Sequence, residues 1–195
     1  MKQYSKFLNS ISDLGNKAII KACKDAGLQQ IGSGSCRVVF ALNDRMVIKI
    51  ALGSAGVEQN ANEIRVHYML NYDFPGWKKY YAKIYPDLGH CRDYFIVMER
   101  LETDFPGRRA YAKELYRMRY NPNNVKNRRA VLQHKAVQYM DDLLCFKNAN
   151  DMHIKNLGMS ANGCIKLLDF GLSNRTLHRH YGLSDRRRIK RERLY

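Results

Sequence analysis

The sequence has 195 residues, a length that suits one ordinary domain or two small lobes that share a cleft. Apolar residues make up 45% of the chain, which is enough to bury a core. Lysine and arginine number 34 against 18 aspartates and glutamates, so the formal net charge is +16. A positive field of this size attracts acidic proteins, nucleic acid or phosphorylated ligands.

The cysteines argue against a disulfide framework and against a zinc knuckle. They are odd in number and widely spaced, and no two form a Cys-x-x-Cys pair. Polar residues interrupt the N-terminal segment, and no long apolar run follows, so we expect neither a signal peptide nor a membrane span. These features predict a soluble protein of a reducing cytoplasm. The five cysteines are Cys23, Cys36, Cys91, Cys145 and Cys164.

The first half of the chain predicts a helical segment followed by a small antiparallel sheet. Apolar residues recur at helical spacing over 3–26, and Gly27 suits the helix C-terminus. Residues 28–50 predict three short strands, with turns at Gly-Ser-Gly-Ser and at Asn43-Asp44. The remaining elements of this half are a helix over 57–70 and strands over 80–85 and 94–101.

The second half is mainly helical. A helix from about 109 is broken at Asn121-Pro122, and a second helix runs over 125–146. Two short strands, over 157–159 and 164–168, are joined by a turn at Asn162-Gly163. The order of elements predicts an α+β fold of two lobes with a cleft between them.

A glycine-rich turn joins the first two predicted strands, within residues Ile31–Phe40. Gly32 and Gly34 would let the backbone approach a triphosphate and offer amide donors to it, with Ser33 between them. The same short Gly-x-Gly also fits an ordinary hairpin.

Lys49 lies inside the apolar strand Met46–Ile50. Burying an ammonium is costly unless it has a partner, and an ATP phosphate would supply one. An edge-strand lysine that reaches water is the alternative. The following helix offers Glu58 or Glu63 as a partner; Glu63 is better placed, but both stay open.

The most specific pattern lies near the C-terminal end. Asp151 and Asn156 are five residues apart in an apparent loop, and Asp169-Phe-Gly closes the hairpin that follows. Phosphoryl transfer needs a carboxylate to orient the nucleophile, a role that suits Asp151. It also needs hard oxygen ligands for Mg²⁺, a role that suits Asn156 and Asp169. Alone, each aspartate also fits a loop cap or a turn.

Taken in order, these motifs resemble the protein-kinase-like superfamily, over about residues 28–174. The resemblance implies a two-lobe fold that binds Mg-ATP, with an antiparallel sheet in the N-lobe and a truncated helical C-lobe. It implies divisions at 1–27, 28–101, 102–174 and a basic tail over 175–195. The nucleotide residues that it implies are Ile31, Gly32, Ser33, Gly34, Val39, Lys49, Glu63, Met98, Glu99 and Leu101, with Asn156 and Asp169 for the metal and Asp151, Lys49 and His153 for catalysis.

Several positions depart from the protein-kinase pattern. Arg37 stands at the third glycine of the loop, where it is expected to stiffen the loop and to be able to meet phosphate. Ala149 and Asn150 replace the His-Arg that usually precedes the catalytic aspartate. His153 replaces the usual lysine and gives a pattern typical of aminoglycoside and choline kinases, and of kinases carried by some tailed phages.

The acceptor is the open part of the prediction. Only 24 residues follow Gly171, too few for the substrate platform of a full protein kinase. We expect a compact Ser/Thr protein kinase, with a small-molecule phosphotransferase or a kinase-like binding module as alternatives. Basic segments over 108–135 and 175–195 predict an acidic protein partner or nucleic acid, although a solvated helix face would look the same.

Overall fold

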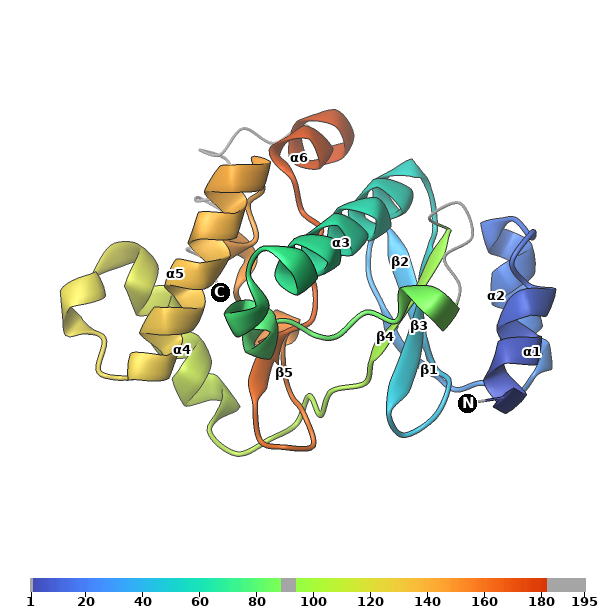
Figure 1. Ribbon diagram of the computed structural model, residues 1–195, viewed down its shortest axis with the longest axis horizontal. Helices are drawn as coiled ribbons and strands as arrows, with labels where there is room; N and C mark the ends of the chain where they lie inside the picture. Colours follow the sequence, from blue (N-terminus) through green and yellow to red (C-terminus); the bar gives the residue numbers. More distant parts are fainter. Residues whose placement is uncertain (1, 89–93, 182–195) are drawn as a thin grey trace.

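A four-stranded antiparallel sheet forms the first lobe. In this computed structural model, which describes residues 2–88 and 94–181, the strands follow the order β1-β2-β3-β4 (Figure 1). The α+β class and the antiparallel sheet predicted from the sequence are confirmed. The strands are β1 (Gln30–Ser33), β2 (Arg37–Ala41), β3 (Met46–Ala51) and β4 (Phe95–Glu99).

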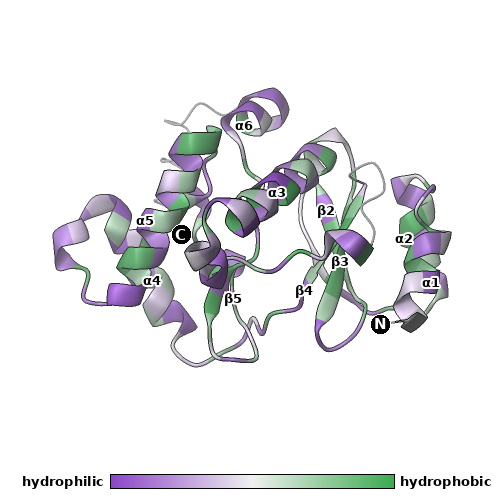
Figure 2. Cartoon of the chain, in the orientation of Figure 1, coloured by the Kyte–Doolittle hydropathy of each residue, from purple (hydrophilic) through white to green (hydrophobic). Residues whose placement is uncertain are grey.

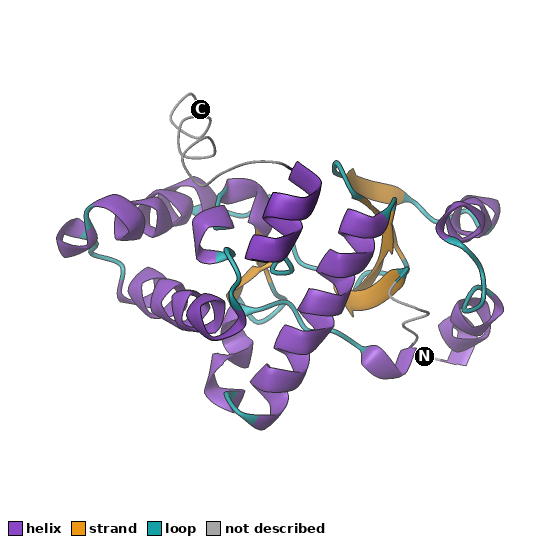
Figure 3. Ribbon diagram, turned by 90° about the horizontal axis from the view of Figure 1, so that it is seen from above, coloured by secondary structure: helices purple, strands orange, loops and turns teal. Residues whose placement is uncertain are grey.

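The two faces of this sheet are covered by different parts of the chain. Alternate residues of a strand point to opposite faces, and β3 is buried along its whole length. Ile48 and Ile50 pack with Leu8 and Ile19 of the N-terminal helices, whereas Val47 packs in the core shared with the second lobe. Figure 3 shows helices on either side of the sheet.

The N-terminal segment is two helices, α1 (Lys2–Ser10) and α2 (Asn16–Asp25), rather than one continuous helical stretch over 3–26. Gly15, in an extended conformation, precedes α2 at the break. The C-terminus of α2 is the one predicted. Gly27 adopts a φ of +70°, its amide donates to Lys24 O, and the amide of Leu28 donates to Cys23 O, which is the Schellman arrangement.

The strand predicted over 80–85 is wrong. Helix α3 (Ser54–Tyr72) is followed by the 3₁₀ turn η1 (Pro75–Tyr80), and the next residues form isolated bridges at Tyr81 and Ile84. Tyr81 pairs with the second-lobe hairpin and Ile84 with β4. The segment crosses from one sheet to the other and does not run beside either for long enough to become a strand.

The second lobe packs helices against a hairpin. The predicted break at Asn121-Pro122 is confirmed, because α4 ends at Tyr120 and a 3₁₀ turn begins at Pro122. Figure 2 shows the far end of α4 and the loop after it mostly in the hydrophilic colour. The 3₁₀ turn η2 (Pro86–Leu88) belongs to the first lobe and contacts β4. The elements of the second lobe are α4 (Arg108–Tyr120), η3 (Pro122–Asn124), α5 (Arg128–Leu144), η4 (Ala149–Asp151), η5 (Ile154–Asn156), β5 (Leu157–Met159), β6 (Ile165–Leu167) and α6 (Asn174–Tyr181).

The segment expected as a basic tail begins as helix α6, and its residues 182–195 lie outside the described part of the chain. His180 of α6 lies 3.0 Å from Glu58 of α3, so this helix is joined to the first lobe. No helix in the described ranges has the length and apolar character needed to cross a bilayer.

Candidate functional site

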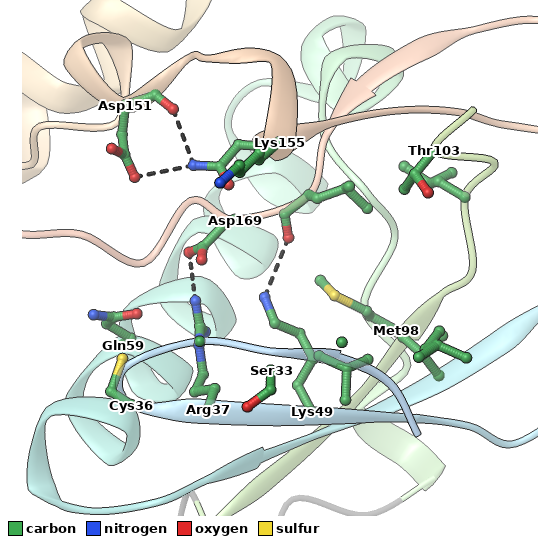
Figure 4. A pocket seen from close by; sticks show the side chains of 18 of the residues that line it. Ser33, Cys36, Arg37, Lys49, Gln59, Met98, Thr103, Asp151, Lys155 and Asp169 are labelled. Carbon is green, nitrogen blue, oxygen red and sulfur yellow. Dashed lines mark hydrogen bonds and ion pairs between the residues drawn. The ribbon is translucent and has the colours of Figure 1, made fainter. Parts of the chain in front are cut away.

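A cavity of about 750 Å³ lies between the two lobes, and it gathers residues from parts of the chain that lie far apart in the sequence. The glycine-rich turn and β3 form one wall, the segment after β4 forms an edge, and η4, η5 and the residues after β6 form the opposite wall (Figure 4). Of the residues singled out from the sequence, the lining includes Ile31, Gly32, Ser33, Gly34, Val39, Lys49, Met98, Glu99, Leu101, Asp151, His153, Asn156 and Asp169.

Glu63 is the remaining candidate, and it lies behind the cavity wall. The Lys49 ammonium donates to both of its carboxylate oxygens, at 2.9 and 3.1 Å, and also to Leu168 O at 3.2 Å. Glu63 is fully buried and accepts a further bond from the Phe170 amide. Of the two glutamates left open by the sequence, Glu63 is therefore the one that pairs with Lys49, whereas Glu58 lies beside His180.

Arg37 extends the buried Lys49–Glu63 pair into a cluster of four charged side chains, which also includes Asp169. Its guanidinium lies 3.0 Å from Glu63 Oε1 and forms an ion pair with Asp169. Burial disfavours the charge of Arg37, but the two carboxylates outweigh burial and raise its pKa. Burial likewise opposes ionisation of Asp169, but Arg37 and Lys49 outweigh it and hold the pKa of that carboxyl well below its usual range. Asp169 is therefore an anion throughout the physiological pH range.

Asp151 lies across the cavity from this cluster, at the end of η4. The Asn156 side-chain amide donates to Asp151 O and to Asp151 Oδ2, both at 3.0 Å. Two acceptors fix the amide nitrogen toward Asp151, so the side-chain oxygen of Asn156 is the atom left for a ligand. His153 Nε2 lies 3.8 Å from Asp151 Oδ1, and its ring is half exposed.

These oxygens fit a magnesium ion. Mg²⁺ binds through one or two protein oxygens and completes its shell with phosphates and water, and Asn156 and Asp169 offer such oxygens in one cavity. Within residues 2–88 and 94–181 there is no cluster of three histidine, cysteine or acidic side chains that could hold a metal alone. A metal at this site would complete its shell with water and with the ligand's own oxygens.

The edge of the cavity offers a backbone donor. At the end of β4 and just after it, the amides of Glu99, Arg100 and Glu102 donate to the carbonyls of Lys83, Arg45 and Met159, respectively. Between them, the Leu101 amide has no acceptor among the described residues, and Leu101 lines the cavity. Apolar side chains of Val39, Val47 and Met98 line the cavity with it. This combination suits a flat heteroaromatic ring that accepts one hydrogen bond.

Packing does not explain the two loop glycines. A methyl group on Gly32 would meet Val39 at 3.6 Å, and one on Gly34 would meet Arg37 O at 3.9 Å, both ordinary contacts. Neither glycine has a positive φ. The room that they leave lies in the cavity wall, where a ligand could approach the backbone.

Three residues that matter to the site were missed in the sequence. Asp141 of α5 accepts a hydrogen bond from the Ala149 amide at 2.6 Å, and the side-chain oxygen of Asn148 accepts from the Leu172 amide at 3.1 Å. Asn60 accepts from Arg37 at 3.3 Å. Asp141 lies on the buried face of the amphipathic helix α5. A carboxylate at such a core position was the signal in the sequence that could have pointed to a structural role.

No model of a protein family matches the sequence, and neither does any curated protein. Solved structures similar to it include three complexes of aminoglycoside phosphotransferases. They are APH(2″)-IIa with streptomycin and ATP (12% identity, TM-score 0.38, 82% of this chain and 71% of that chain), APH(2″)-IIa with gentamicin (15%, 0.39, 82% and 70%) and APH(2″)-IIIa with GDP and kanamycin (12%, 0.36, 85% and 80%). At TM-scores below 0.5 these similarities carry no weight in the functional assignment, which rests on the site itself.

Proposed function

We propose that this chain is an ATP-dependent phosphotransferase that moves the γ-phosphoryl group of Mg-ATP to a hydroxyl group. The observation that supports this most strongly is the cavity that holds the Lys49–Glu63 pair on one side and Asp151 with Asn156 on the other. A buried lysine–glutamate pair alone is only a structural ion pair. Facing a carboxylate and an amide oxygen across one cavity, it forms a site for a triphosphate and an acceptor.

In this proposal the adenine ring lies against the apolar wall and accepts a hydrogen bond from the Leu101 amide. The loop that contains Gly32 and Gly34 covers the phosphates, and the Lys49 ammonium, oriented by Glu63, contacts them. These are the roles that the resemblance to kinases implies for these residues, and they stay predictions.

Asp151 orients the acceptor hydroxyl and receives its proton. The acceptor oxygen forms a bond to the γ-phosphorus, the bond from that phosphorus to the ADP oxygen breaks, and the hydroxyl proton passes to the Asp151 carboxylate. Asn156 holds Asp151 in place through its amide nitrogen and would hold Mg²⁺, with Asp169, through its oxygen. When bound, Mg²⁺ neutralises charge on the phosphates.

We propose a small hydroxyl-bearing molecule as the acceptor. The chain after Gly171 is bound into the second lobe: Leu172 donates to Asn148 and its carbonyl accepts from Lys147. It then enters α6, which contacts α3 through His180. Leu172 and Leu177 of this segment line the cavity, so the segment packs there as part of its wall. Such a wall suits a small molecule held in the cavity better than an extended peptide strand.

An acidic protein is the second candidate acceptor, and the charge on the second lobe favours it. Exposed cations gather on α4, on the loop after it and on α5, and they would attract an acidic surface. Nucleic acid would be attracted by the same face, and that partner stays a prediction. The exposed residues are Arg109, Lys113, Arg117, Lys126, Arg128 and Lys135.

An acceptor screen tests the proposal and separates the two candidates. The protein is incubated with Mg-ATP labelled in the γ-phosphate, in one arm with sugars, choline-like compounds and aminoglycosides and in the other with acidic proteins, and the products are identified by mass spectrometry. We expect labelled small-molecule product that disappears in Asp151→Asn. Label on protein serine or threonine alone would favour the second candidate, and no transfer in either arm would contradict both.

A further inference from the structure

Arg37 occupies the centre of the candidate phosphate site, where the resemblance to kinases implies a glycine. It is the first residue of β2, and its side chain is 5% exposed. Figure 4 shows the guanidinium pointing from the strand toward Asp169, to which a dashed line joins it. Nη2 pairs with Asp169 Oδ1, whereas Nη1 donates to Asn60 Oδ1 and lies 3.0 Å from Glu63 Oε1.

Two of these three partners keep Arg37 in the site whether or not Asp169 binds a ligand. Asn60 and Glu63 belong to α3, are completely buried, and are not candidate metal ligands. If Asp169 turned away, the guanidinium would still be held by the amide oxygen and the carboxylate of α3. Because arginine stays protonated in proteins, its charge is permanent. Arg37 is therefore a fixed cation of the site.

The charges of the cluster balance without a metal. Lys49 and Arg37 contribute two positive charges, and Glu63 and Asp169 contribute two negative charges. Without Arg37 the cluster would carry a net negative charge, which would attract divalent cations to Asp169. With it, a second divalent cation at Asp169 would meet a guanidinium in a partly desolvated position, where like charges repel strongly.

Arg37 also takes up coordination capacity. The kinase pattern has two magnesium ions, held by the counterparts of Asp169 and Asn156, and the aspartate needs both carboxylate oxygens to serve two ions. Here the guanidinium holds Oδ1 of Asp169. One carboxylate oxygen and the Asn156 oxygen remain, which suffices for one ion.

We propose that Arg37 takes the place of a second divalent cation, so that this site binds its nucleotide with a single metal ion. The inference rests on the proposed function, since it requires that the cavity bind ATP. The positive charge of Arg37 beside Asp169 then stands where the charge of a second ion would otherwise stand, and it does so at any metal concentration.

Counting bound metal tests this directly. The experiment uses Mn²⁺ in place of Mg²⁺ and a non-hydrolysable ATP analogue in place of ATP. Nucleotide binding is measured by equilibrium dialysis, and bound Mn²⁺ is measured by electron paramagnetic resonance. We expect one Mn²⁺ per bound nucleotide in the wild type and in Arg37→Lys. In Arg37→Gln we expect two. Arg45→Gln, in the exposed turn between β2 and β3, is the matched control and should give one.

Each outcome decides the point. Two Mn²⁺ ions per nucleotide in the wild type would overturn the inference while leaving the proposed function intact. One ion per bound nucleotide in a folded Arg37→Gln would also overturn it. If Arg37→Gln does not fold, the wild-type and Arg37→Lys counts decide. No nucleotide bound to the wild type would overturn the proposed function, and the inference with it.

Discussion

Asp141 is a buried carboxyl group whose ionisation should be visible in the stability of the protein. It lies on α5 with 6% of its surface exposed, and Oδ2 accepts from the Ala149 amide at 2.6 Å. Oδ1 has no hydrogen-bond partner in the described structure. Burial raises the pKa of Asp141 to about 7, although hydrogen bonds from Ala149 and Asn148 act in the opposite direction.

The sign of the effect follows from the two pKa values. Between about pH 4 and pH 7 the unfolded chain has lost the Asp141 proton while the folded protein keeps it. The stability that this proton contributes is therefore lost as the pH rises through this window. A shift of roughly 3 pH units corresponds to about 4 kcal/mol at most, at 1.36 kcal/mol per unit.

The assay is urea denaturation of the wild type and of Asp141→Asn between pH 5 and pH 8. Asparagine keeps an oxygen for the Ala149 amide and cannot ionise. We therefore expect the variant to gain stability relative to the wild type as the pH rises, by about 2–3 kcal/mol between pH 5 and pH 8. Asp142→Asn, exposed at the next position, is the control and should change little. A stability difference between wild type and Asp141→Asn that is the same at every pH would refute this reasoning.

Two further substitutions test the packing around the cavity. Glu63→Gln leaves the buried cations Lys49 and Arg37 with one carboxylate fewer, so we expect a loss of about 3–5 kcal/mol in the free energy of unfolding. A loss below about 1 kcal/mol would contradict the burial of these ion pairs. Gly171→Ala would place a methyl group 2.2 Å from Gln59 O, so we expect a loss of about 1–3 kcal/mol and a lower melting temperature. Gly76→Ala, where a methyl group meets nothing within 4 Å, is the control, and an equal effect of both would count against the close contact.

The sequence predicts best where a local pattern determines the local structure. The hydrophobic strands around Lys49, the proline break after Tyr120 and the glycine end of α2 each follow from a few neighbouring residues. The strand predicted over 80–85 failed because its apolar residues are explained by contacts with two different sheets. Periodicity cannot show which partner a segment has.

The site shows the same limit. The order of the motifs predicted which residues would meet at the cavity, because each is tied to a strand end or a loop. Side-chain pairings between different elements were harder to predict from the sequence. Arg37 lies 132 residues from Asp169 in the chain, and no local rule connects them. Asp141 was missed because its role depends on hydrogen bonds from Asn148 and from the Ala149 amide, which lies eight residues away. Such contacts follow from packing and not from pattern.

The most direct test of the account is ATP turnover by the wild type and by Asp151→Asn, measured together with nucleotide affinity. In the proposed function, Asp151 orients the acceptor and receives its proton, and it does not bind ATP. We therefore predict that the affinity for Mg-ATP stays within about 3-fold and that turnover falls by about 100-fold or more. Equal turnover in both proteins, at equal affinity, would contradict the assignment of this cavity as a phosphotransferase site.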